Sequence, residues 1–179
     1  MAHEFERTQR IAVLGGGPGG YEAALAGAQL GADVTLVERA GVGGSAVLTD
    51  VVPSKTLIAT AEAVNGIRSS TELGVQFRAR SGSGTSVGPE VTVNLAAVNT
   101  RLLELAEQQS EDMKSQLIKA GVRIIHGEGR LDGPQRLVVA TGKSGSDFDE
   151  VDADTLVISV GARPRMLDSA MPDGERILT

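Results

Sequence analysis

The sequence predicts an α/β fold with a parallel βαβ unit near the start and an antiparallel β-meander later. A short apolar run at 10–14 precedes a glycine-rich turn, a helix-forming stretch follows, and a second apolar run comes at 33–38. Strand, turn, helix and strand within about thirty residues are typical of a βαβ unit. Farther along, three strand-like runs are separated mainly by polar and glycine-rich turns, which favours a meander.

The first half of the chain should hold two buried strands and two helices. The strands are the apolar runs at 10–14 and 33–38, and the helix between them covers 21–30. A second helix is expected over roughly 54–65, because Pro53 suits a first helical turn. The residues expected on its apolar face and at its C-cap are Leu57, Ile58, Ala61, Val64 and Gly66.

A long helix should open the second half. Asn94 can cap its start, apolar residues keep helical spacing from Leu95 to Leu117, and Gly121 stops it. Gln109 interrupts the apolar stripe, which allows a bend or break there. The remaining predictions are a surface loop at 81–88, strands at 122–126, 136–140 and 155–160, and a polar hairpin tip at 141–150.

Composition and charge exclude several classes of function. The chain of 179 residues suits one domain. Its net charge of −6 argues against nucleic-acid binding, which needs Lys and Arg to neutralise phosphates. With no cysteine and two isolated histidines, neither a disulfide nor a metal site is expected. No apolar run approaches the ~20 residues that span a bilayer and the N-terminus is polar, so a cytoplasmic protein without a transmembrane segment is expected.

A dinucleotide-binding motif follows the first strand. Gly15, Gly17 and Gly20 fit G-x-G-x-x-G, in which glycines allow a tight turn, close approach of a pyrophosphate and close helix packing. Glu38 ends the second strand, where a carboxylate can accept both ribose hydroxyls of an adenosine. An acidic residue there disfavours the 2′-phosphate of NADP. The motif therefore predicts a Rossmann-like domain and leaves FAD and NAD both open.

Four segments together point to one family. They are GGGPGG at 15–20 with Glu38, the GGS…PSK segment at 43–55, HGEG at 126–129 and SVGARP at 159–164. In order and spacing this set resembles the FAD-binding segment of the pyridine-nucleotide disulfide oxidoreductases, the family of lipoamide dehydrogenase and glutathione reductase. The family pattern for the last segment is Ala-Thr-Gly-Ser-x-Pro. Val160 stands in the place of that threonine, so a hydroxyl contact is lost there.

The resemblance implies a role for each matching residue toward FAD. Glu38 would hold the adenosine ribose, and Ser45 keeps the hydroxyl of the family's usual threonine. Lys55 of Pro-Ser-Lys would lie by the flavin N5 edge as a catalytic residue. A second argument for this role is that the helix dipole disfavours a cation in a first helical turn, so its presence there calls for another explanation. The alternative is a solvent-facing lysine. The other implied contacts are Gly15, Gly17, Gly19, Gly20 and Gly44 at the pyrophosphate, Gly129 near the adenine and Gly161 where the meander rejoins the sheet.

The family's redox cysteines are replaced. In the family two cysteines with four residues between them form a disulfide beside the flavin; here Ala46 and Val51 hold those positions, which excludes dithiol exchange. The chain most resembles a cysteine-less actinobacterial branch, the NAD(P)H-quinone reductases. That resemblance implies FAD as cofactor, NAD(P)H as substrate and a quinone-like acceptor that takes electrons directly from the flavin. The alternatives are a non-catalytic flavin-binding or interaction module and an NAD-only dehydrogenase half.

The family's NAD(P)H-binding and C-terminal dimerisation domains have no counterpart in the sequence, because no second glycine fingerprint follows residue 38. We therefore expect residues 1–179 to be one FAD-binding domain, the N-terminal segment of a longer flavoenzyme. Alone it should bind FAD weakly and be inactive. The homodimer that the family resemblance implies would depend on the absent C-terminal domain.

Overall fold

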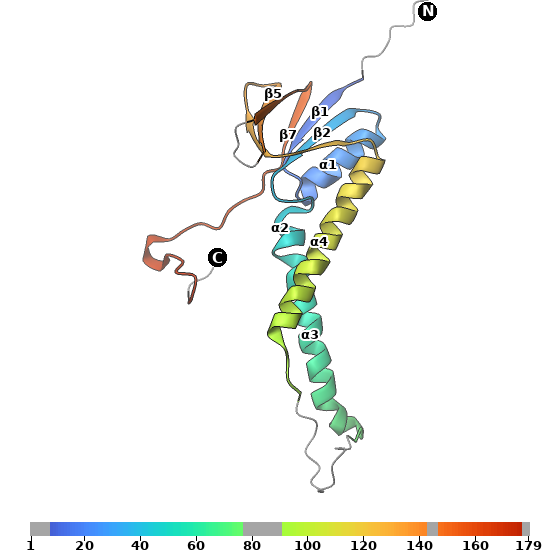
Figure 1. Ribbon diagram of the computed structural model, residues 1–179, viewed down its shortest axis with the longest axis vertical. Helices are drawn as coiled ribbons and strands as arrows, with labels where there is room; N and C mark the ends of the chain where they lie inside the picture. The colour runs from blue at the N-terminus through green and yellow to red at the C-terminus, as the bar shows by residue number, and fades with distance from the viewer. Residues whose placement is uncertain (1–7, 77–90, 143–146, 177–179) are drawn as a thin grey trace, which may run out of the picture.

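Four parallel strands form the sheet that leads into the glycine-rich turn (Figure 1). The computed structural model describes residues 8–76, 91–142 and 147–176. The strands lie in the order β3-β2-β1-β7, and every neighbouring pair is parallel. The carboxyl ends of all four strands therefore share one edge. The strands are β1 (Arg10–Leu14), β2 (Asp33–Glu38), β3 (Arg123–His126) and β7 (Thr155–Ile158), so the predictions at 10–14 and 33–38 are confirmed.

A separate antiparallel sheet is the predicted meander, built from partly different strands. It consists of β4 (Glu128–Leu131), β5 (Arg136–Thr141) and β6 (Asp147–Asp152), in that order. The sequence did not indicate β4, and the prediction of a hairpin tip at 141–150 was wrong where β6 begins. Only Val151 of β6 is buried, so this acidic edge strand has no apolar run to reveal it. The runs predicted at 122–126 and 155–160 are strands, but they belong to the parallel sheet as β3 and β7.

The helices of the first half begin earlier than predicted. Helix α1 starts at Pro18, which occupies the first helical turn, where proline loses no hydrogen bond. Gly66 was wrongly predicted as a C-cap, because its helix continues to Ser69 and a short 3₁₀ turn η1 follows until Gly74. Helix α2 was not predicted, since five residues are too few to show a period. The elements are α1 (Pro18–Gln29), α2 (Gly44–Leu48), α3 (Val51–Ser69) and η1 (Ser70–Leu73).

Helix α4 (Leu95–Lys119) follows its prediction closely. The Asn94 Oδ1 accepts a hydrogen bond from the Ala97 N–H at 3.1 Å, which confirms the cap. Gly121 takes a left-handed conformation just beyond the end of the helix. The helix is continuous through Gln109, so the bend allowed there does not occur. The loop predicted at 81–88 lies outside the described residues.

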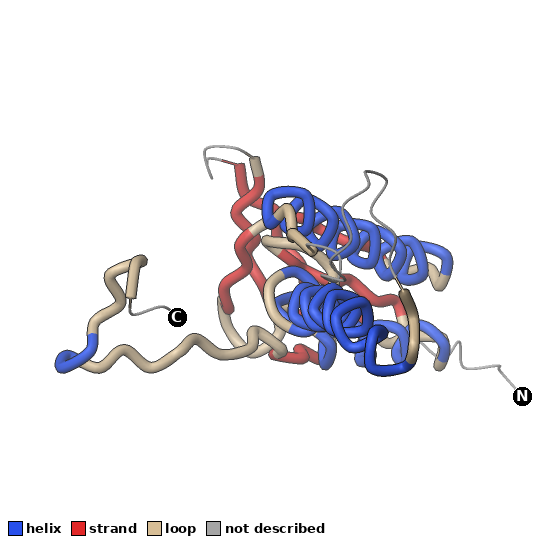
Figure 2. The backbone as a smooth tube through the Cα atoms, turned by 90° about the horizontal axis from the view of Figure 1, so that it is seen from below, coloured by secondary structure: helices blue, strands red, loops and turns tan. Residues whose placement is uncertain are grey.

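Helices α3 and α4 lie side by side and extend away from the sheets as a long arm (Figures 1 and 2). No residue of α3 is buried. Leu57 and Ile58, predicted on its apolar face, are 50% and 55% exposed. The apolar residues of α3 therefore have helical spacing in the sequence, but they do not face a core in this chain.

The core lies on both faces of the parallel sheet. Alternate residues of each strand point to opposite faces, so Val13 and Leu36 pack with α1 and α4, whereas Ala12 and Val37 pack toward the meander. Tyr21 adds a polar link, because its hydroxyl donates to Gln116 Oε1 at 2.7 Å and so joins α1 to α4. This double-sided burial explains why β1 and β2 read as continuous apolar runs.

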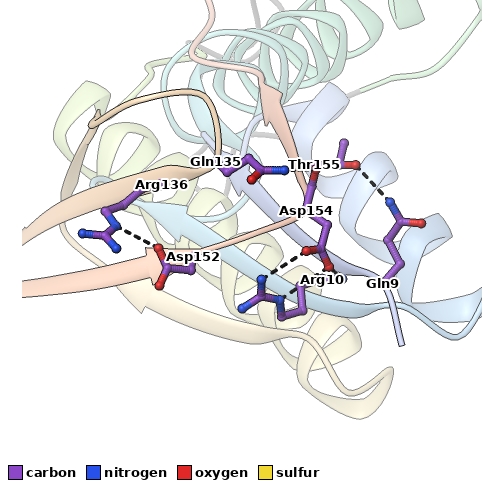
Figure 3. A network of polar contacts seen from close by, with 7 residues as sticks. All are labelled: Gln9, Arg10, Gln135, Arg136, Asp152, Asp154 and Thr155. Atoms are coloured by element: carbon purple, nitrogen blue, oxygen red, sulfur yellow. Dashed lines mark hydrogen bonds and ion pairs between the residues drawn. The ribbon is translucent and has the colours of Figure 1, made fainter. Parts of the chain in front are cut away.

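A polar network fastens β1 where the strand begins (Figure 3). The Arg10 guanidinium donates to both carboxylate oxygens of Asp154, at 3.1 and 3.4 Å. The hydrogen bond to Asp154 is the largest cause that raises the pKa of Arg10. Nearby, Arg136 Nε donates to Asp152 Oδ1 at 2.8 Å. Arg10 thus joins β1 to the turn between β6 and β7, and Arg136 joins β5 to the end of β6. The contact of β1 lies at the opposite end of the parallel sheet from the glycine-rich turn.

Candidate functional site

A cavity of about 730 Å³ opens at the carboxyl ends of β1, β2 and β7. This is where parallel α/β sheets characteristically bind ligands. Its walls come from the glycine loop after β1, the end of β2, α2, the β3–β4 turn and the segment after β7. Of the predicted site residues, all except Gly20 and Lys55 line it. They are Gly15, Gly17, Gly19, Glu38, Gly44, Ser45, Gly129 and Gly161.

The glycine loop packs too closely for a larger residue at two positions, Gly15 and Gly20. Gly15 has a φ of +99°, and a Cβ there would run into the carbonyl group of Ser159. A Cβ on Gly20 would run into the Gly15 carbonyl oxygen. Gly20 is buried, so it allows α1 to start directly behind the loop instead of lining the cavity.

The first turn of α1 faces open space. At Gly17 a Cβ would meet no atom within 4 Å. No side chain caps this helix, and its first turn has no acidic residue, so its N-terminal N–H groups suit an anion. The Gly43 N–H donates to the Gly16 carbonyl at 2.7 Å, which holds the start of α2 against the glycine loop. The residues present therefore fit the pyrophosphate of a dinucleotide cofactor such as FAD.

Glu38 organises the loops around the cavity. Its Oε2 accepts a hydrogen bond from the Gly16 N–H at 2.6 Å, and its Oε1 accepts from the Ala40 N–H at 2.7 Å and the Gly41 N–H at 3.4 Å. An ionised carboxylate offers about four lone-pair positions, so it can hold these donors and still accept from a hydroxyl. This arrangement suits a ribose and would repel a phosphate at the same place.

Several residues that line the cavity were missed in the sequence. Ser159 lies against the first turn of α1, since a Cβ on Gly19 would be 3.1 Å from its hydroxyl oxygen. This hydroxyl belongs to the residue just before Val160, which stands in the place of the family's threonine and has no hydroxyl. Arg39, Thr49 and Arg163 also line the cavity. Arg39 directly follows Glu38, so its position beside a predicted binding residue was a signal that could have identified it.

Lys55 lies apart from this group. It is exposed in α3 and does not line the cavity. Because α3 begins at Val51, Lys55 is in the second helical turn and the dipole argument for it is weaker than expected. Its place beside a flavin stays a prediction.

The described residues contain no cluster of three or more His, Asp or Glu that could hold a metal ion. In the same parts of the chain, no helix is long and apolar enough to cross a membrane.

Known proteins share both the sequence and the fold. The sequence model of the pyridine nucleotide-disulphide oxidoreductase family matches residues 9–176. An NAD(P)H dehydrogenase (quinone) of Mycobacterium tuberculosis is 40% identical over 178 residues, which are 95% of this chain and 34% of that protein. A dihydrolipoyl dehydrogenase of Chlorobaculum parvum is 34% identical over 169 residues, 94% of this chain and 33% of that protein. The chain thus spans about a third of the length of the curated relatives it matches.

Two solved structures match the fold of this chain. The crystal structure of LpdA from Mycobacterium tuberculosis matches with a TM-score of 0.79 at 38% identity, covering 96% of this chain and 36% of that one. The flavoprotein disulfide reductase RclA from Escherichia coli matches with a TM-score of 0.65 at 17% identity, covering 89% of this chain and 29% of that one. The second match supports the fold alone.

Proposed function

The chain belongs to the pyridine nucleotide-disulphide oxidoreductase family, and from this premise we propose that it forms the FAD-binding domain of a flavoprotein oxidoreductase. The protein carries electrons from NAD(P)H through FAD to a quinone-like acceptor. The observation that supports this best is one cavity shared by the glycine loop, Glu38 and the segment after β7. The likeness to an NAD(P)H dehydrogenase (quinone) supports the choice of acceptor.

In this proposal the chain's own residues bind and orient the cofactor. The first turn of α1 and the start of α2 hold the pyrophosphate, and Glu38 accepts from the adenosine ribose while it fixes the glycine loop. Gly129 in β4 would border the adenine, and Gly161 after β7 would border the remainder of the cofactor. Lys55 would lie at the flavin edge. Bound FAD would supply hydride acceptance and onward electron transfer.

The acceptor follows from what the chain lacks. Some relatives are dihydrolipoyl dehydrogenases, yet this chain has no cysteine, and Ala46 and Val51 hold the positions of the redox pair. Neither side chain can relay electrons by thiol exchange. Ala46 is half-buried and Val51 is 46% exposed, so both offer apolar surface without chemistry of their own. We therefore propose direct transfer from flavin to a flat apolar acceptor, in an enzyme that forms a homodimer through residues outside this chain.

Anaerobic spectroscopy of the natural full-length protein tests the proposal. NADH or NADPH should bleach the visible flavin bands, menadione should restore them, and lipoamide should leave them bleached. Reoxidation by lipoamide would contradict the proposed acceptor. If neither nicotinamide bleaches the flavin, the alternative of a non-catalytic flavin-binding module is supported instead, and a protein without flavin bands would overturn both.

A further inference from the structure

A second cavity, of about 610 Å³, lies between α4 and the end of β2 and β3. Its volume is within the range of about 300–1,000 Å³ that is usual for small-molecule sites. It shares Glu38, Ala40 and Leu48 with the cofactor cavity, so the two lie on either side of the loop after β2. None of the predicted cofactor contacts except Glu38 lines it. The proposed function thus leaves this cavity without a role.

The lining of this α4 cavity is mainly apolar. Val42 and Ala106 are buried, with exposed fractions of 3% and 2%. Leu103 and Ile118 on α4 also line the cavity but are about half exposed, at 53% and 56%. An apolar ligand would remove these two side chains from water, which is favourable in proportion to the area covered.

Ser110 supplies the polar group inside. It lines the α4 cavity and is only 7% exposed, yet its hydroxyl makes no hydrogen bond to any described residue. Thr100, on the same helix, bonds back to the Ala96 carbonyl at 3.1 Å, but Ser110 does not. Gly41 leaves room for this hydroxyl, because a Cβ there would be 3.0 Å from it. No buried polar side-chain atom among the described residues lacks a partner, so the Ser110 hydroxyl is open to solvent through the cavity, where the polar group of a ligand can take the place of water.

The charges around the cavity select against ionic ligands. Glu38 accepts from backbone N–H groups but keeps its negative charge, and Glu111 pairs with Lys114 at 3.1 Å. Glu107 also lines the cavity, and among the described residues it has no ion-pair partner. An anion would be repelled by the carboxylates of Glu38 and Glu107. A buried cation would find only Glu38, which already accepts from three backbone N–H groups, and the exposed Glu107, and these compensate little for its lost hydration.

We propose that the α4 cavity binds a small, uncharged organic molecule with a hydroxyl or carbonyl group that pairs with Ser110. The site is distinct from the cofactor cavity and does not depend on the proposed function. The ligand's apolar body would cover Leu103 and Ile118, and its polar group would reach the Ser110 hydroxyl on the inner wall. A ligand here would also touch the loop that Glu38 fixes, next to the cofactor.

Calorimetric titration of the full-length, FAD-loaded protein with naphthol tests this site, because FAD keeps the probe out of the cofactor cavity. Naphthol should bind saturably, and naphthoate and naphthylmethylamine at least about tenfold more weakly. Ser110→Ala should weaken naphthol binding about three- to tenfold, as expected for one hydrogen bond. Ser110→Leu should weaken binding at least as much, because it removes the hydroxyl and places a bulkier side chain on the inner wall of the cavity. Thr100→Ala, a change on the same helix but outside the cavity, should leave it unaltered.

Three results would overturn the proposal. One is the absence of saturable naphthol binding, another is equal affinity for naphthoate, and the third is unchanged affinity in Ser110→Ala. If Ser110→Leu does not fold, Ser110→Ala still decides, because it removes one oxygen and keeps a good helix former. Repeating the titration on protein stripped of FAD gives the same order of variants if the site is independent of the cofactor.

Discussion

Glu38 is the residue on which the cofactor cavity depends most. One carboxylate accepts from three backbone N–H groups and lines both cavities. The sequence predicted its position because the spacing from the glycine loop is itself a geometric requirement of the βαβ unit. The hydrogen bonds to Gly16, Ala40 and Gly41 could not be predicted, because they depend on how the loops fold back.

Glu38→Gln should weaken FAD binding. The amide places N–H groups where acceptors are needed, both for the loop and for the ribose. Loss of charge-assisted hydrogen bonds worth about 1.5–3 kcal/mol each predicts an increase in the FAD Kd of about tenfold or more. The Kd can be measured by quenching of flavin fluorescence. Glu107→Gln is the matched control, since Glu107 lines only the α4 cavity; an equal effect of both changes would contradict this role of Glu38.

Gly20→Ala should destabilise the fold. The new methyl group would meet the Gly15 carbonyl oxygen, and relieving such overpacking costs about 1–3 kcal/mol. Gly66→Ala is the opposite case, because a Cβ there meets nothing within 4 Å inside helix α3, and it should stabilise by about 0.5–1 kcal/mol. Thermal unfolding of both variants checks this pair. A Gly20→Ala protein as stable as the wild type would refute the described packing of the loop.

The helices and strands that could be predicted from the sequence are those whose residue pattern comes from burial or from a local cap. Strands β1 and β2 are buried on both faces, so each is an unbroken apolar run, and α4 begins at a side chain that bonds within its own first turn. Strands β4 and β6 lie at the edges of the antiparallel sheet, largely exposed, and are identified only by their pairing with β5. Helix α2 takes its shape from contacts with α3 and α4.

The attachment of β1 to the β6–β7 turn should contribute to the thermal stability of the fold. Asp154→Asn removes the charge that the Arg10 guanidinium contacts, so Tm should fall by a few degrees while the FAD Kd stays unchanged, because the network is at the far end of the sheet. Asp112→Asn, an exposed change on α4, should alter neither. A large change in the FAD Kd in Asp154→Asn would show that the two ends of the sheet are coupled.

The same pair has a defined pH dependence. Asp154 raises the pKa of Arg10 in the folded protein. A pKa that is higher in the folded than in the unfolded protein stabilises the fold at every pH below the unfolded pKa, and this stabilisation is lost only above that value. The Tm difference between wild type and Asp154→Asn should therefore stay constant from neutral to mildly alkaline pH. A difference that shrinks across that range, followed by calorimetry, would contradict the assignment to Arg10.

The whole molecule consists of two sheets and a helical arm that extends away from them (Figures 1 and 2). The cofactor cavity lies at the carboxyl ends of β1, β2 and β7. The residues of the glycine loop and Glu38 that line this cavity could be predicted because they belong to one sequence motif. Ser159 and Arg163 could not, since they reach the cavity only when β7 pairs beside β1. The exposure of α3 could not be predicted either, because the spacing of its apolar residues resembles that of a buried helix.

In the proposed function, electrons leave the flavin without passing through a disulfide. Anaerobic reductive titration of the full-length protein distinguishes the two routes, because a redox disulfide would store a second pair of electrons. A single two-electron equivalent per FAD should bleach the flavin completely, and menadione should recover all of it. Uptake of a second equivalent per FAD, with thiols appearing in the reduced protein, would contradict it.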